Sequence, residues 1–107
     1  MANTFRNSLL ADVGTSYTDI YTCPTGIKSI IIEVDVCNKT ETYITVDVTL
    51  EKAGADYQMV HAAPVPVGGT LSVVSGQKIV LEGDDKIKIR SSANTSVDVI
   101  CSILEDV

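Results

Sequence analysis

His61 is the only histidine in the sequence, and its side chain is the one that ordinarily titrates near neutral pH. A catalytic histidine needs a nucleophile beside it and a carboxylate that orients its ring. The chain has no Gly-x-Ser-x-Gly elbow and no papain-like cysteine environment to supply that nucleophile. We therefore expect His61 to be a packed or surface residue, and the sequence favours a protein that is not an enzyme.

Candidate metal and phosphate ligands are equally sparse. Cys23, Cys37 and Cys101 are widely spaced and form no Cys-x-x-Cys pair, so they predict neither a zinc site nor a disulfide framework. We expect free buried thiols, although a bridge between two of them stays open. The acidic run 82–85 lacks the spacing of a calcium loop and fits a turn, and Gly68-Gly69 lacks the Lys-Ser/Thr of a phosphate loop. The sequence thus predicts no metal and no cofactor.

The composition describes one aliphatic domain over residues 1–107. Hydrophobic residues make up 45% of the 107 positions, with no Trp and a single Phe, so the core must be built from Val, Ile and Leu. A formal charge of −6 repels phosphate backbones and anionic lipid, so we expect neither nucleic acid nor membrane as a partner. Residues 1–4 are polar and predict an extended N-terminal arm or a frayed end.

Alternation of apolar and polar residues is the dominant pattern, and it predicts strands. In 29–38 the apolar set is Ile30, Ile32, Val34 and Val36; the segments 44–51 and 97–103 repeat the pattern. Shorter runs predict further strands at 5–13, 17–23, 57–62, 70–74, 78–81 and 86–90. About eight or nine strands with Gly- and Pro-rich turns predict an all-β, single-domain antiparallel β-sandwich of jelly-roll type.

The remaining candidates for a binding site are apolar residues on strand faces that are predicted to be exposed to solvent. Ile31, Ile100 and Leu104 fall opposite the predicted core sets of their strands, which suggests that a partner covers part of the surface. The N-terminal segment with Phe5 and Arg6, and the strand with Tyr57 and Met59, are further predicted contact sites. Exposed edge strands would favour ordered assembly, including a homo-oligomer.

Several segments of the chain also match a known pattern in order. The stretch 12–24 reads DVGTS-x-TDIYT-x-P, a β-branched strand ending in Asn38 follows, and APVPVGGTL (63–71), KIVLEGD (78–84) and SVDV (96–99) come later. Taken together these segments cover nearly the whole chain, and it resembles a family of small structural proteins of tailed bacteriophages. Members of that family are regarded as virion proteins, and the resemblance implies no catalytic residues.

The resemblance implies a virion protein that is assembled in the bacterial host cytoplasm. We expect a capsid decoration or cement protein that binds the major capsid protein or another virion protein. Such a protein would form a homo-oligomer, with a trimer at three-fold positions as one arrangement. A neck, tail or fibre-attachment component is the alternative within this class. From a different class, a carbohydrate-binding module on a jelly-roll scaffold remains open, since Tyr17, Tyr21, Tyr43 and Tyr57 are present.

Overall fold

The computed structural model consists of β-strands joined by turns and describes residues 3–106, apart from the side chains of 75–77. The eight strands are β1 (Thr4–Val13), β2 (Thr18–Thr22), β3 (Ser29–Asn38), β4 (Ile44–Lys52), β5 (Ala55–Val65), β6 (Thr70–Leu81), β7 (Lys86–Ser91) and β8 (Val97–Glu105). No helix occurs among the described residues. The prediction of an all-β chain is confirmed.

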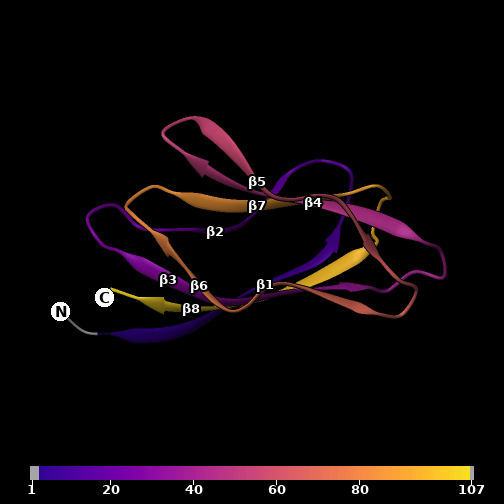
Figure 1. Ribbon diagram of the computed structural model, residues 1–107, viewed down its shortest axis with the longest axis horizontal. Coiled ribbons are helices and arrows are strands. Elements are labelled where there is room, and N and C mark those ends of the chain that lie inside the picture. The colour runs from indigo at the N-terminus through magenta and orange to yellow at the C-terminus, as the bar shows by residue number, and fades with distance from the viewer. Residues whose placement is uncertain (1–2, 107) are drawn as a thin grey trace.

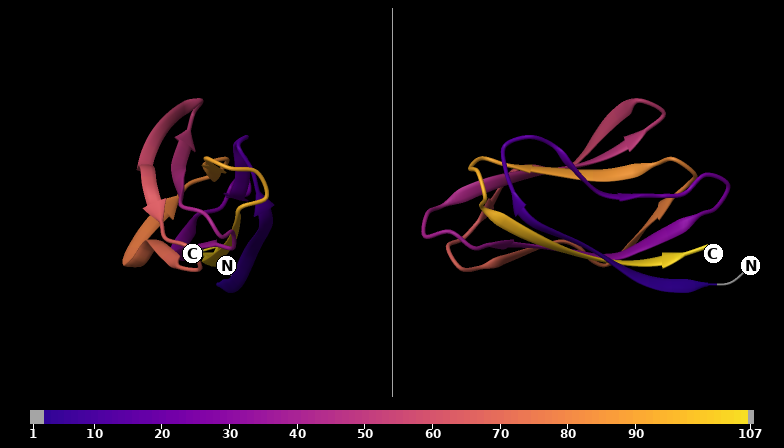
Figure 2. Two further views of the ribbon diagram at one scale, coloured as in Figure 1. Left: turned by 90° about the vertical axis from the view of Figure 1, so that its right-hand side faces the viewer. Right: turned by 180° about the vertical axis from the view of Figure 1, so that it is seen from behind.

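The strands form two four-stranded antiparallel sheets that pack face to face (Figure 1). Sheet A has the order β1-β8-β3-β6 and sheet B the order β2-β7-β4-β5. Apart from the β4–β5 hairpin, each strand is followed by a strand of the opposite sheet. This nested alternation is the jelly-roll topology, so the predicted architecture is confirmed. Because Thr4 pairs with Glu105, the chain ends lie at the same end of the sandwich (Figure 2).

The core between the sheets is almost entirely aliphatic. Its largest fully buried side chains are Ile31, Ile44, Leu81, Ile87, Ile89 and Ile103, and valines fill most of the remaining space. β-Branched side chains suit this layer because they pack well on a pleated surface and lose little rotamer freedom there. Each such side chain contributes about 1.5–3 kcal/mol when it is removed from water. Neither a metal nor a disulfide is needed to explain the stability of the sandwich.

Two strands are longer than the sequence predicts. The predicted break between 74 and 78 does not exist, because β6 continues through it with register shifts against β3. The strand predicted to stop before Pro64 runs on to Val65 instead. β5 is the outermost strand of sheet B, where a residue without an N–H donor is tolerated. The predicted arm is also shorter, since Thr4 already belongs to β1; residues 1 and 2 lie outside the described residues.

A tight hairpin joins β4 to β5. Lys52 pairs with Ala55, and the two residues between them, Ala53 and Gly54, both have positive φ (53° and 82°). Two successive left-handed residues form the turn that matches the twist of a two-residue hairpin. Figures 1 and 2 show the tip of this hairpin projecting away from the two layers. At its base, Lys52 pairs with Glu82 and Asp85, and Asp56 pairs with Lys88 of β7.

Candidate binding surface

Four apolar side chains form a row across the whole outer face of sheet A, which we call the apolar row. Phe5 of β1 pairs with Leu104 of β8, and Leu104 also pairs with Ile30 of β3. Ile30 in turn pairs with Val80 of β6. Directly paired residues lie on the same face of a sheet, so the four side chains are neighbours. Phe5 is 76% exposed and Val80 58% exposed, and the two inner residues are half-buried.

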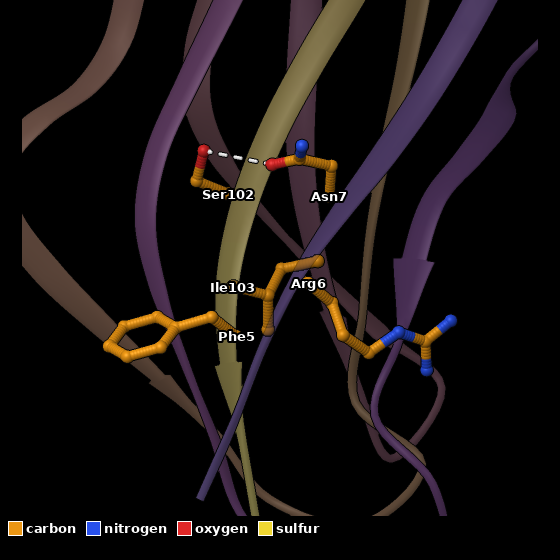
Figure 3. A pocket seen from close by; sticks show the side chains of 5 residues that line it. All are labelled: Phe5, Arg6, Asn7, Ser102 and Ile103. Atoms are coloured by element: carbon orange, nitrogen blue, oxygen red, sulfur yellow. Dashed lines mark hydrogen bonds between the residues drawn. The ribbon is translucent and has the colours of Figure 1, made fainter.

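A second apolar pair lies further along the same face. Leu9 pairs with Ile100, and their exposures are 64% and 54%. The pair Asn7 and Ser102 separates it from the apolar row, with the Ser102 hydroxyl donating to Asn7 Oδ1 at 3.4 Å (Figure 3). Two shallow hollows mark this surface. One of about 240 Å³ is lined by Phe5, Arg6, Asn7, Ser102 and Ile103, and one of about 340 Å³ by Leu9, Leu10, Ala11, Asp98, Val99 and Ile100.

A β-bulge in β3 decides which isoleucines reach this face. The alternation of 29–38 predicts Ile30 and Ile32 inside and Ile31 outside, but Ile31 is fully buried and the other two are half-buried. The register of β3 shifts between Ile31 and Glu33 against both neighbouring strands. An extra residue at a bulge reverses the alternation beyond it. The prediction that Ile31 lies on the outer face is therefore wrong, and Ile30 occupies that face instead.

Two carboxylates on β3 share this face and have no cation beside them among the described residues. Glu33 lies close to Asp35, and the hydrogen bond and charge of Asp35 raise the pKa of Glu33, with a smaller contribution from burial. Asp35 accepts a hydrogen bond from the Ser72 hydroxyl at 2.8 Å. Two like charges on one face repel each other. The outer face of sheet A thus combines exposed apolar groups with uncompensated negative charge.

The charged side chains on the outer face of sheet B form ion pairs with one another. Lys88 Nζ lies 2.8 Å from Glu51 Oε1, and Arg90 Nε lies 2.8 Å from Asp47 Oδ2. The Tyr17 ring lies beneath both cations, at 5.0 Å from Lys88 Nζ and 4.6 Å from the Arg90 guanidinium carbon. Cations over an aromatic face are attracted to it. This surface therefore offers a partner few groups that are not already engaged.

His61 has the carboxylate neighbour that a catalytic histidine needs, and that carboxylate is shared with two other groups. Its Nδ1 lies 3.0 Å from Asp47 Oδ1, and the same carboxylate accepts the Ala62 N–H at 2.6 Å and the Arg90 guanidinium. Burial alone would raise the pKa of Asp47, but the hydrogen bonds from Ala62 and Arg90, with the charges of Arg90 and His61, lower it on balance. Among the described residues, no hydroxyl or thiol hydrogen-bonds to the His61 ring, which is 72% exposed. Asp47 holds Ala62 in its left-handed conformation, with φ 49°.

Three of the seven predicted partner-binding residues lie together. Phe5, Ile100 and Leu104 share the outer face of sheet A, as the register shows. Tyr57 and Met59 lie on β5 in the other sheet, so they belong to a separate surface. Met59 packs against the core, whereas Tyr57 is 57% exposed in the projecting hairpin.

Arg6 points to the other side of β1 from Phe5 (Figure 3). Its guanidinium lies 3.1 Å from Glu105 Oε2, and the Tyr21 hydroxyl donates to the same oxygen. The Tyr21 hydrogen bond lowers the pKa of Glu105 most, with Arg6 adding to it and burial opposing it. Burial and Glu105 together raise the pKa of Tyr21. Arg6 thus ties β1 to the end of β8 rather than joining the apolar row.

Sequence reasoning missed Leu9, Ile30 and Val80 on this face. The spacing of Phe5, Asn7 and Leu9 in a single strand would have placed Leu9 beside Phe5. Ile30 and Val80 required the positions of the register shifts in β3 and β6, which no residue type marks.

The described cysteines form no disulfide. Cys23, Cys37 and Cys101 are free, the first and last are buried, and burial raises the pKa of the Cys101 thiol to about 12. Within 3–106 no group of three or more His, Cys, Asp or Glu side chains is placed to hold a metal ion. The described residues contain no helix of the length and apolarity that crossing a membrane requires.

Comparison with known proteins supports the fold. No family model matches the chain, and no curated protein matches it. The chain is similar to a solved structure described as "Bacillus endospore appendages form a novel family of disulfide-linked pili", with a TM-score of 0.55 and 12% identity. The superposition covers 97% of this chain and 87% of that chain. At this identity the likeness extends to the β-sandwich fold and no further.

Proposed function

We propose that this chain is a non-catalytic structural protein of a bacteriophage particle, which binds the major capsid protein through the outer face of sheet A. The observation that carries the proposal is the apolar row, which crosses all four strands of that sheet. Monomeric proteins rarely leave large contiguous apolar patches in water, and such patches mark contact sites. The matching face of sheet B is occupied by its own ion pairs, so the two faces differ in what they offer a partner.

The fold suits a cementing role because it is rigid. Both sheets are tied together by one aliphatic core, and the free energy of binding is not spent on ordering a flexible chain. A protein that binds the closed shell better than separated capsomers stabilises the shell by mass action. Many copies on one lattice add up, so each interface can be modest, below about 1,200 Å² in total.

The assignment to a phage rests on the resemblance of the ordered sequence segments to tailed-phage structural proteins. Jelly rolls occur in viral capsid domains as well as in lectins and cupins, so the topology is compatible with the proposal but does not select it. The second candidate is a neck, tail or fibre component, and the similarity to a pilus protein favours this candidate to the extent that a jelly roll can build fibres. The pili in that description are disulfide-linked, whereas Cys23 and Cys101 are buried here and no cysteine is paired.

A carbohydrate-binding role has less support. Tyr21 is buried and cannot stack on a sugar, and the Tyr17 ring already contacts the Lys88 and Arg90 cations. Tyr43 and Tyr57 are exposed, at 66% and 57%, but lie outside the apolar row and on different segments. Sugar binding on a jelly roll would therefore need a platform that these residues do not build.

Counting copies in purified particles tests the capsid role directly. A decoration protein is expected at on the order of hundreds of copies per particle, because it follows the capsid lattice. Quantitative mass spectrometry against the major capsid protein gives this ratio. A dozen copies or fewer would move the protein to the neck or tail, and its absence from particles would overturn the proposal.

Two matched variants then test which surface binds. Ile100→Glu places a charge on the outer face of sheet A, and Tyr57→Glu makes the same change on the projecting hairpin at similar exposure, 54% against 57%. We expect Ile100→Glu to abolish binding to capsids that lack the protein, and Tyr57→Glu to leave it unchanged. Co-sedimentation with such capsids measures both. The reverse result would place the contact on sheet B.

A further inference from the structure

The sandwich has four edge strands, and three of them carry features that discourage pairing with another chain. β2 has five residues and a register shift between Asp19 and Tyr21. β5 contains Pro64 and the left-handed Ala62, and its register against β4 shifts twice. β6 has two register shifts against β3 and carries Lys78. Short strands, bulges, Pro and Lys are the devices by which natural sheets block edge pairing.

β1 lacks these devices over most of its length. From Thr4 to Leu10 it makes seven consecutive pairs with β8 without a register shift, and the irregularity begins only after Leu10. This stretch contains neither Pro nor Gly. Its one charged residue, Arg6, is already paired with Glu105. In a chain of net charge −6, the stretch from Thr4 to Leu10 carries no acidic residue, so it brings no carboxylate against a second copy.

The side chains of this edge are complementary to themselves. Phe5 and Leu9, with exposures of 76% and 64%, lie on one face at equal distances on either side of Asn7. We propose that two copies of the chain pair antiparallel through β1, with the two-fold axis at Asn7. Phe5 of each copy then lies opposite Leu9 of the other. Aromatic–aliphatic pairs directly across two strands stabilise a sheet, and such a contact is isologous.

The pairing also joins the apolar groups that are separate in one copy. Leu104 and Phe5 of one copy continue into Leu9 and Ile100 of the other, and the symmetric row forms four positions further along β1. On the opposite side of the strand, Arg6 faces Ser8 of the second copy, so no like charges meet. The two A sheets become one sheet of eight strands. This inference does not depend on the proposed capsid role, because the contact uses the edge of sheet A and can be measured without a capsid.

Self-association of the purified chain is the first test. We expect a dimer by sedimentation velocity at concentrations up to about 1 mM, the range in which weak dimers form. Leu9→Lys should weaken it by about tenfold or more, because each substitution removes two apolar pairs per dimer. Val80→Lys is the control: it makes the same change at an exposed site on the same face but at the β6 edge. The melting temperature of each variant verifies that it is folded.

Cross-linking tests the register. In a Cys37→Ser background, Asn7→Cys should form an interchain disulfide under mild oxidation, because paired Cα atoms lie about 4.5–5.5 Å apart. Leu9→Cys should not, since the two copies of residue 9 would be separated by about 13 Å along the strands. A monomer at every concentration, a dimer that Leu9→Lys leaves intact, or equal cross-linking at positions 7 and 9 would each overturn the proposal.

Discussion

The outer faces of the two sheets differ in the side chains that cover them. Each covers a four-stranded sheet with the same aliphatic core beneath it. Sheet B fills its face with ion pairs such as Lys88–Glu51 and Arg90–Asp47, around the Tyr17 ring. Sheet A has an apolar row instead, and its central carboxylates have no cation among the described residues. A stable sandwich does not require an exposed apolar row, because the outer face of sheet B is covered by ion pairs instead.

Under the proposed role, the difference between the two faces bears on binding rather than on folding. Ion pairs at the surface contribute about 0–1 kcal/mol each to stability, so most pairs of sheet B add little, and Asp47, which accepts from Ala62 and Arg90, adds most. Exposed apolar groups contribute even less to the folded monomer but gain much when a partner removes them from water. Changes on the two faces should accordingly separate into effects on stability and effects on binding.

The largest expected effect lies at the boundary between the core and the face of sheet A. Ile31→Ala should lower the free energy of unfolding by about 2–5 kcal/mol, because it leaves a cavity in a fully buried layer. Ile30→Ala, one residue earlier on the half-buried outer side, should cost at most about 1 kcal/mol. Chemical denaturation of both variants measures the difference. Equal losses would mean that the bulge does not divide the two isoleucines as described.

This boundary is also where reasoning from sequence failed, and the reason is physical. β8 follows strict alternation without a bulge in its interior, so Val97, Val99, Cys101 and Ile103 were placed correctly in the core. In β3 one extra residue reverses the phase, and the three residues before Glu33, which are Ile30, Ile31 and Ile32, are all β-branched and apolar. Nothing in their types distinguishes an inward from an outward position.

The ion pairs of sheet B could not be predicted from the sequence, for a different reason. Asp47 and Arg90 are 43 positions apart, and only the β4–β7 register brings them opposite each other. Local alternation predicts that each faces outward but not which residue it meets. The β-sandwich architecture, by contrast, follows from strand number and turn chemistry, which are local properties.

The next effect concerns the best-connected carboxylate of sheet B. Asp47→Asn should lower the free energy of unfolding at pH 7 by about 1–3 kcal/mol, since a charged acceptor for the Ala62 and Arg90 donors is lost. The pKa of Asp47 is lowered in the folded state. Its contribution is therefore complete above its unfolded value of about 4 and is lost as the pH falls through the lower folded value.

Denaturation curves between pH 7 and pH 2 measure this contribution. The variant should lose less stability on acidification than the wild type does, although Asp98 and Glu105, whose pKa values are also lowered, keep part of the acid sensitivity in both. Parallel pH profiles would show that Asp47 does not contribute through its charge.

The smallest effect is predicted to have the opposite sign on sheet A. The pKa of Glu33 is raised by Asp35, so the folded state favours the neutral carboxyl. That advantage is present below the unfolded pKa and is lost as the pH rises through the folded value. Glu33→Gln is neutral at every pH and should therefore raise the melting temperature slightly at pH 7, with the gain shrinking below about pH 4.

Glu41→Gln is the matched control for this substitution, because it removes the same charge from an exposed position outside the strands. It should leave the melting temperature unchanged, which separates a local repulsion from the general effect of reducing a net charge of −6. If Glu33→Gln instead destabilised the protein as Asp47→Asn is expected to, the carboxylate would have to be compensated within the monomer. The two faces would then be alike in their electrostatics, and negative charge would be no reason to expect a basic partner surface on sheet A. A gain for Glu33→Gln alone would mean that this face retains a repulsion in the free chain that a cation supplied by a partner can relieve.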